Sequence, residues 1–223
     1  MTLTLHFAPG SCARVSLIAL ETIGVPYELR AVRFMKGEHR SPAYLAINPA
    51  GKVPALVADG IALAQTPAIL TYLARRFPEA GLLPLTGDAM ADAQIAARLA
   101  WFSGDLHPLV TRIRMPHFFC DLDGSPAQVR EMGMAGMRLQ LGGLEAELAT
   151  QPWVLGADWS ALDAYLFWVW FRITGAGFPV TDFPGLVAHH ARMHALPVIQ
   201  RALAREGEVQ AALEAEGLAV PLH

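Results

Sequence analysis

The pattern of predicted secondary structure changes once along this chain of 223 residues, and that change limits the possible folds more than any other feature. Up to residue 78, short apolar strands alternate with amphipathic helices, which is typical of an α/β unit. Residues 79–87 are rich in proline and glycine and indicate a linker. Residues 88–223 show only helical periodicity. The sequence therefore predicts an α/β domain over 1–78 and an all-helical domain over 88–223.

A cysteine lies in the turn before the first predicted helix. A strand over Leu3–Phe7 leads into Pro9-Gly10-Ser11-Cys12, and apolar residues at helical spacing follow. Free backbone N–H groups, the helix dipole and Arg14 would favour a thiolate at this helix start, so Cys12 is predicted to be reactive. The alternative is a small buried apolar residue, the usual state of a free cysteine. Cys120 follows Phe118-Phe119, has no such setting and is expected to react slowly.

Further strands and a second helix complete the expected α/β domain. Tyr27–Val32 alternates between apolar and polar residues and predicts a strand parallel to the first. Pro54 begins an apolar run that suits a strand, and Val53 would keep its N–H and C=O free for another partner. Asp59-Gly60 predicts a hairpin. Thr66 as N-cap and Pro67 as first helical residue predict a helix start that could bind an anion.

The all-helical part contains one helix that is apolar on all sides. Ser160 and Asp163 have the spacing of a capping box, with Asp in place of Glu or Gln. The aromatic run that follows predicts a helix in the middle of a bundle. Further helices are expected over 125–149, 183–195 and 198–206, with a short acidic tail after Gly207. The first of these contains glycines that we interpret as packing against a neighbouring helix: Gly133, Gly136, Gly142 and Gly143.

Composition argues against several classes of function. A net charge of -3 without a basic run predicts no nucleic-acid partner and no membrane surface partner. The cysteines Cys12 and Cys120 give no disulfide framework, and no signal peptide or membrane-spanning run is found, so a cytoplasmic protein is expected. His189, His190 and His194 include a pair spaced four residues apart, but no carboxylate or cysteine completes a metal site, and no metal is expected.

Several motifs, taken in order, resemble the cytosolic glutathione transferase family. They are a strand followed by Pro-Gly-Ser-Cys, then Asn-Pro-Ala-Gly-Lys-Val-Pro-Ala-Leu, Gln-Thr-Pro-Ala-Ile and Ser-Ala-Leu-Asp-Ala-Tyr. Cys12 together with the histidine of Asp105-Leu106-His107-Pro108 is most similar to the bacterial beta class. The resemblance implies a thioredoxin-like N-terminal domain, an all-α helical-bundle C-terminal domain, a homodimer and a cis peptide bond before Pro54.

The resemblance also implies a site for glutathione as co-substrate. The backbone of Val53, next to Pro54, would pair with the cysteinyl part of glutathione as one strand pairs with another. Gln65 and Thr66 would hold the γ-glutamyl carboxylate and amine at a helix start. Many family members have an acid where this chain has Gln65, and Asp105 could supply the missing charge across a dimer interface.

Other residues would act on the rest of the glutathione molecule. Lys36 and Lys52 are candidates for binding its glycine carboxylate. Cys12 and His107 would lie close to its sulfur and favour the thiolate, which is the nucleophile. Some classes use a serine in this turn, so Ser11 is a rival to Cys12.

The second substrate would be a small hydrophobic electrophile. The resemblance places it against an apolar wall formed by Phe7, Val110, Ile113 and Trp168. The tyrosine-dependent classes carry tyrosine near Phe7, and a phenyl ring cannot donate a hydrogen bond, so that mechanism is not expected. The sequence thus predicts a glutathione transferase that serves detoxification, with thiol–disulfide exchange at Cys12 as a further activity.

Two other functions fit the same residues. A non-catalytic glutathione-binding or protein-interaction module could use this fold, because fold alone does not determine function. Such a module has no need to combine Cys12 with Val53-Pro54 and Gln65-Thr66. A disulfide reductase could use Cys12, and since the chain has no Cys-x-x-Cys motif, the disulfide would form with glutathione. Many apolar electrophiles fit the predicted pocket equally.

Overall fold

The computed structural model describes residues 2–222, which form two compact units. Unit 1 contains the described residues up to Leu85 together with Ala195–Leu222, and unit 2 contains Thr86–His194. This division differs from the predicted domains, because residues 79–85 of the predicted linker and the last helix both group with the N-terminal part of the chain. That helix, α9 (Pro197–Ala215), packs against α1 (Ala13–Ile23).

Unit 1 is built on a four-stranded mixed sheet with the strand order β2-β1-β3-β4. The strands are β1 (Leu3–Phe7), β2 (Glu28–Ala31), β3 (Ala55–Ala58) and β4 (Ile61–Ala64). β1 is parallel to β2 and antiparallel to β3, and β3 is antiparallel to β4. The predicted hairpin is confirmed, since Asp59 and Gly60 have φ values of 48° and 84°, as a type I′ turn requires.

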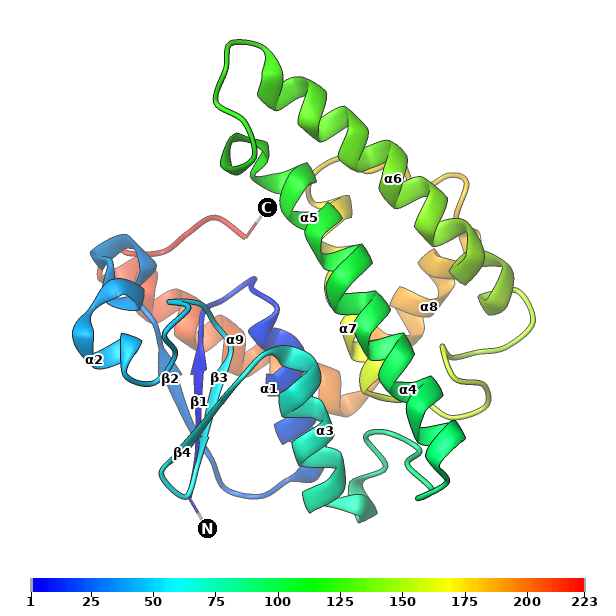
Figure 1. The fold of residues 1–223 in the computed structure, drawn as a ribbon, viewed down its shortest axis with the longest axis horizontal. Helices are drawn as coiled ribbons and strands as arrows, with labels where there is room; N and C mark the ends of the chain where they lie inside the picture. Colours follow the sequence, from blue (N-terminus) through cyan, green and yellow to red (C-terminus); the bar gives the residue numbers. More distant parts are fainter. Residues whose placement is uncertain (1, 223) are drawn as a thin grey trace. The chain divides into compact units, whose positions relative to one another are not determined.

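The helices of unit 1 lie on both faces of this sheet. Besides α1 and α9 they are α2 (Pro42–Leu45) and α3 (Thr66–Arg76), with short 3-10 turns at Phe34–Lys36, Glu38–Arg40 and Pro78–Ala80. α1 and α3 cover one face and α2 lies on the other (Figure 1). Leu5, Phe7 and Leu56 are fully buried and form the core beneath α1 and α3, because alternate residues of a strand point to the same face.

Helix α9 is longer than predicted. The sequence predicted a helix over 198–206 and a tail after Gly207, whereas the helix continues through Gly207 to Ala215. Its buried residues Ile199, Ala202 and Glu206 are spaced three and four apart, which gives one face for packing. Packing against α1 therefore outweighs the cost of about 1 kcal/mol that a glycine brings to a helix interior.

Unit 2 is all helical. Its helices are α4 (Ala89–Trp101), α5 (His107–Arg114), α6 (Ser125–Leu148), α7 (Ala161–Thr174) and α8 (Pro184–Ala195), with a 3-10 turn at Pro116–Phe118. A π-helical segment, Phe102–Leu106, joins α4 to α5. The predicted capping box at Ser160 and Asp163 is confirmed, and α7 is buried almost all round, as its apolar run predicts.

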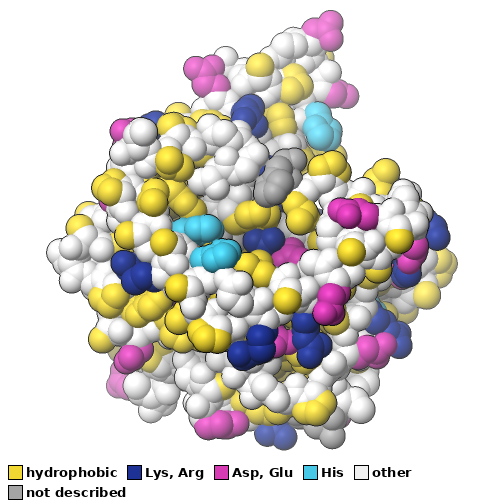
Figure 2. Space-filling view, turned by 180° about the vertical axis from the view of Figure 1, so that it is seen from behind, with side chains coloured by type: hydrophobic (Ala, Val, Ile, Leu, Met, Phe, Trp, Pro, Cys, Tyr) yellow, Lys and Arg dark blue, Asp and Glu magenta, His cyan; other side chains and the backbone are white. Residues whose placement is uncertain are grey.

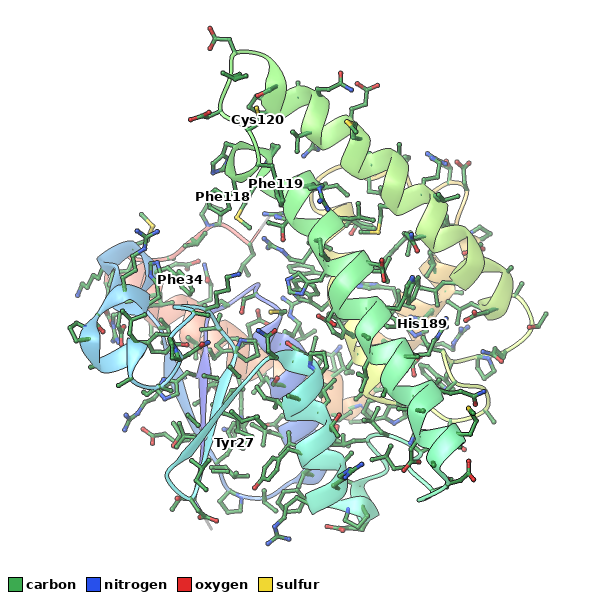
Figure 3. The ribbon with its side chains drawn as sticks, in the orientation of Figure 1. Tyr27, Phe34, Phe118, Phe119, Cys120 and His189 are labelled. Carbon is green, nitrogen blue, oxygen red and sulfur yellow. The ribbon has the colours of Figure 1, made fainter. Side chains whose placement is uncertain are left out.

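A buried polar cluster ties the start of α7 to α8. Asp163 Oδ1 accepts hydrogen bonds from Val154 N and His189 Nε2, both at 2.8 Å, and its other oxygen binds Ser160. His189, labelled in Figure 3, therefore has a structural role. Among residues 2–222, no group of three or more His, Cys, Asp or Glu side chains is placed to hold a metal ion.

Two of the four glycines of α6 pack closely against α5. A Cβ atom on Gly133 would lie 3.1 Å from Arg112 Cβ, and one on Gly136 would lie 3.0 Å from Leu109 Cδ2. Gly142 and Gly143 face open space in the described part of the chain. The packing interpretation is thus confirmed for the first two glycines and wrong for the other two.

The surface carries charges of both signs. On the face shown in Figure 2, basic and acidic side chains are interspersed among hydrophobic ones, and neither sign covers a region alone. In the described part of the chain, no helix is both long enough and apolar enough to cross a membrane.

Candidate functional site

Three of the predicted site segments meet at one end of the sheet of unit 1. The register places Ala55, the first residue of β3, opposite both His6 of β1 and Ala64 of β4. The residues just before β3 and just after β4 therefore lie beside the turn that follows β1. These residues are Val53-Pro54 and Gln65-Thr66, and the turn is the one that contains Ser11-Cys12.

Cys12 is the N-cap residue of α1 and its residue surface is 8% exposed. Its Sγ lies 3.6 Å from the carbonyl oxygen of Val53, to which the thiol donates. A hydrogen bond to a carbonyl favours the protonated thiol, whereas the helix start favours the thiolate. The two effects oppose each other, so a ligand that engages the Val53 carbonyl would weaken the hold on the thiol proton.

The Ser11 hydroxyl is already used within the turn. It donates to the carbonyl oxygen of Ala8 at 2.6 Å and accepts from the N–H of Ala13 at 3.2 Å. A hydroxyl has one proton to donate. Ser11 would have to give up the bond to Ala8 in order to donate to a ligand sulfur, and this favours Cys12 over Ser11 as the residue that acts there.

Glu206 holds the cysteine turn and was missed by the sequence interpretation. Its Oε1 accepts from Gly10 N at 2.5 Å and from Arg14 Nη2 at 3.1 Å, and its Oε2 accepts from Arg14 Nε at 2.6 Å. The side chains of Arg14 and Glu206 are both buried. The charge of Arg14 is thus compensated, so it adds less to thiolate stabilisation at Cys12 than the sequence suggested. The sequence did contain a signal for this role, because Glu206 is an acidic residue on the apolar face of α9.

The loop before β3 is held by its own buried side chains. The Val53–Pro54 peptide bond is cis, as expected. The Lys52 carbonyl accepts from Tyr44 Oη at 2.7 Å and from Asn48 Nδ2 at 2.6 Å. Burial raises the pKa of Tyr44 to about 12, so the phenol stays protonated and remains a donor. In the described structure the Val53 N–H has no hydrogen-bond partner and is available for strand-like pairing.

The start of α3 differs from the prediction. Thr66 is the first helical residue, Gln65 is the N-cap, and neither side chain caps the helix. Gln65 has φ 73° and ψ 120°, a region that costs a non-glycine residue about 1–3 kcal/mol. The strand pairing of Ala64 leaves a single residue to turn the chain into the helix, which explains this conformation. The result is a helix start without a side-chain cap, which suits an anion.

The two lysines differ in their surroundings. Lys52 is exposed on the loop before β3. Lys36 Nζ lies 4.0 Å from Glu216 Oε2, and Glu216 also accepts two hydrogen bonds of 2.9 Å from Arg33. The Arg33 guanidinium lowers the pKa of Glu216. A ligand carboxylate at Lys36 would therefore compete with an ionised Glu216.

In unit 2, His107 is the first residue of α5 and is held by aromatic neighbours. Its Nδ1 lies 2.9 Å from Tyr165 Oη, and its ring meets the Trp168 ring edge to face at 4.6 Å between centroids. Tyr165 thus has a polar role that the aromatic run did not reveal. Asp105 is exposed in the π-helical segment.

The four residues predicted to form the electrophile wall are all buried. Their exposed fractions are 0% for Phe7, 3% for Val110, 0% for Ile113 and 3% for Trp168. Phe7 lies on the core face of β1, and the α5 residues face the interior of unit 2. These side chains contribute to the cores of their own units, and their contact with a second substrate stays a prediction.

The slow reaction expected of Cys120 stays a prediction. This residue lies beside Phe118 and Phe119 on the loop after α5 (Figure 3). The nearby Ser125 side chain and Leu122 backbone lower its pKa.

Comparison with known families gives matches to both parts of the chain. Residues 1–75 match the model described as "Glutathione S-transferase, N-terminal domain", and residues 127–192 match "Glutathione S-transferase, C-terminal domain". The curated protein "Glutathione S-transferase GST-4.5" of Xanthomonas campestris pv. campestris is 34% identical, over 96% of this chain and 98% of that protein.

Solved structures with the same fold include bacterial proteins. A bacterial beta class glutathione S-transferase of Sphingomonas chungbukensis superposes with a TM-score of 0.80 at 28% identity, covering 92% of this chain and 98% of that one. A sphingomonad glutathione S-transferase complexed with glutathione gives a TM-score of 0.81 at 27% identity, with coverages of 92% and 98%.

Proposed function

Because this chain belongs to the glutathione S-transferase family, we propose that it adds the thiolate of glutathione to small apolar electrophiles, using a site at the end of the sheet in unit 1. The observation that supports this site best is the meeting of Cys12, the free Val53 N–H and the uncapped start of α3. We also propose a cytoplasmic protein with a role in detoxification.

The backbone and the helix start would bind glutathione. The Val53 N–H and C=O, presented next to cis Pro54, would pair with the cysteinyl unit. Gln65 and Thr66 would hold the γ-glutamyl group at the start of α3, where the helix dipole favours a carboxylate. The exposed Lys36 and Lys52 are the candidates for the glycine carboxylate.

Cys12 and His107 would act on the glutathione sulfur. Pairing of the cysteinyl N–H with the Val53 carbonyl would draw that carbonyl away from the Cys12 thiol and leave the helix start to stabilise a thiolate. The Tyr165 hydroxyl, bonded to Nδ1 of His107, would fix the orientation of the imidazole ring. Asp105 would supply a negative charge for the glutathione amine in place of the acid that Gln65 lacks.

Replacing Gln65 with Gly should change stability and binding in opposite directions. Glycine adopts a positive φ without strain, so the free energy of unfolding should rise by about 1 kcal/mol. Glutathione should bind about tenfold more weakly, because hydrogen bonds to charged groups contribute roughly 1.5–3 kcal/mol. Thermal unfolding and isothermal titration calorimetry with glutathione measure the two effects.

The matched control is Asp59→Gly, which replaces the other described non-glycine residue with positive φ. It lies in the β3–β4 turn and should leave glutathione affinity unchanged. Equal affinity in the Gln65→Gly and unaltered proteins would reject the role of Gln65. An absence of any glutathione binding by the unaltered protein would reject the proposed function itself.

A second prediction concerns assembly. We expect a homodimer, because the family resemblance implies one and Asp105 would act across its interface. Light scattering at micromolar concentration should give twice the mass of the single chain. A monomer with full transferase activity at that concentration would contradict both the dimer and the role of Asp105.

A further inference from the structure

The outer face of the sheet in unit 1, opposite α1 and α3, holds a hollow of about 250 Å³. Because strand residues alternate, Thr4 and His6 of β1 point away from the core that contains Leu5 and Phe7. The register places Arg30 beside His6, and Val57 between Thr4 and Ala62. The segment that follows α2 forms one wall of the hollow.

Small apolar residues form the floor of this hollow. A sheet face that is open to solvent usually carries polar side chains at every second position. Here Val57 and Ala62 occupy such positions, Gly60 adds no side chain, and Ala46 and Ile47 line the wall. The floor therefore consists of short side chains that leave the space above it unfilled, and polar groups of Thr4, His6 and Arg30 also line the hollow.

His6 borders the hollow, and its ring nitrogens are not among the buried polar atoms that lack a partner in the described structure. The residue is 6% exposed, and in the described structure neither of its ring nitrogens makes a hydrogen bond. Its ring meets the edge of the Tyr44 ring at 5.6 Å between centroids. The ring can therefore exchange hydrogen bonds with solvent or with a ligand that enters the hollow.

The charges around His6 come from three residues. Arg30 donates from Nε to Glu28 Oε1 at 2.8 Å, which leaves the other N–H groups of its guanidinium for a further acceptor. Burial first, and then the charge of Arg30, lowers the pKa of His6, whereas Glu28 and Glu38 act in the opposite direction. The imidazole is therefore neutral near pH 7 and offers one donor and one acceptor.

We propose that this hollow is a second ligand site, separate from the glutathione site, and that it takes a small apolar carboxylate. The hydrocarbon part would lie on Val57, Ala62 and Ile47, and the carboxylate would accept hydrogen bonds from His6 and Arg30. A volume of about 250 Å³ is below that of a drug-sized pocket, so the ligand is of fragment size. The proposal does not rest on the assigned transferase activity.

The test uses three probes with the same ring: benzoate, benzyl alcohol and benzylamine. Nuclear magnetic resonance of the His6 ring, with glutathione present at saturation, should show benzoate binding with a Kd on the order of 1 mM. Benzyl alcohol should bind more weakly, and benzylamine should not bind measurably. Bound carboxylate should raise the pKa of His6, because a nearby negative charge stabilises the imidazolium.

Two variants of the same edge strand separate this site from others. Ala62→Trp fills the hollow and should abolish the benzoate effect on His6. Ile61→Trp alters a residue that does not line the hollow and is 75% exposed, and should retain the effect. Arg30→Gln should weaken benzoate severalfold more than benzyl alcohol.

Three results would overturn the proposal: no change at His6 up to the solubility limit of benzoate, an unchanged effect in Ala62→Trp, or equal affinity for benzoate and benzylamine. Calorimetry with glutathione on the same samples keeps the two questions apart. If the unaltered protein does not bind glutathione, the glutathione site is refuted, and the benzoate result at His6 remains valid.

Discussion

Replacing Glu206 with Gln should lower the free energy of unfolding by about 3 kcal/mol or more, the largest effect on stability that we expect from a single substitution here. Removing one partner of a buried ion pair leaves the other charge in a medium that solvates it poorly. Arg14 and Glu206 are both buried, and the same carboxylate also accepts from Gly10 N. A protein of this size should melt about 6–12 °C lower for such a loss.

Glu216→Gln is the matched control. Glu216 directly follows α9 and also pairs with an arginine, Arg33, but both side chains are 37% exposed. Exposed ion pairs contribute little, so this variant should melt close to the unaltered protein. The double variant Arg14→Met/Glu206→Leu should recover much of the loss, because it removes both charges. Equal melting temperatures for Glu206→Gln and Glu216→Gln would refute the assigned importance of the buried pair.

Replacing Cys12 with Ala should remove nearly all exchange with glutathione disulfide. In the reaction that we propose, the Cys12 thiolate attacks one sulfur of glutathione disulfide, forms a mixed disulfide and releases one glutathione thiolate. A second glutathione thiolate then attacks the glutathione sulfur of that mixed disulfide, regenerates Cys12 and forms glutathione disulfide. Mass spectrometry should place the adduct at Cys12, with a reaction pKa below the ordinary thiol value of about 8.5.

Cys120 must be removed from the reference protein for this experiment, because Ser125 and Leu122 lower its pKa. In a Cys120→Ala background, an adduct at Cys12 supports the mechanism, and the absence of any adduct contradicts it. Conjugation and exchange are then compared in the Cys12→Ala variant. If conjugation survives while exchange is lost, Ser11 or a backbone N–H activates glutathione. If both are lost, Cys12 serves both reactions.

Local sequence patterns were sufficient to determine most elements of the fold. The strand Leu3–Phe7, the helix that starts after Cys12 and the Asp59-Gly60 hairpin each depend on neighbouring residues, through strand alternation, helical spacing or turn chemistry. The capping box at Ser160 and Asp163 is also local. Such interactions join residues that are close together in the sequence, so they can be predicted from the sequence alone.

The candidate site was only partly determined in this way. Its segments carry recognisable motifs, but the start of α3 was misplaced by one residue because the pairing of Ala64 in the sheet decides where the strand ends. The positive φ of Gln65 follows from that long-range pairing. In the same way, burial of Phe7 and Val110 depends on which elements pack over them, and an apolar stripe looks the same on a pocket wall and in a core.

Only the tertiary structure decided which distant side chains meet. Glu206 lies 192 residues from Arg14 in the sequence, and the bond between Tyr165 and His107 spans 58 residues. The outer hollow needs four strands and the end of α2 in a particular register before His6 can face it. A sequence shows the chemical type of each of these residues. Their pairing depends on packing over the whole unit, since burial is what makes a lone carboxylate require a partner.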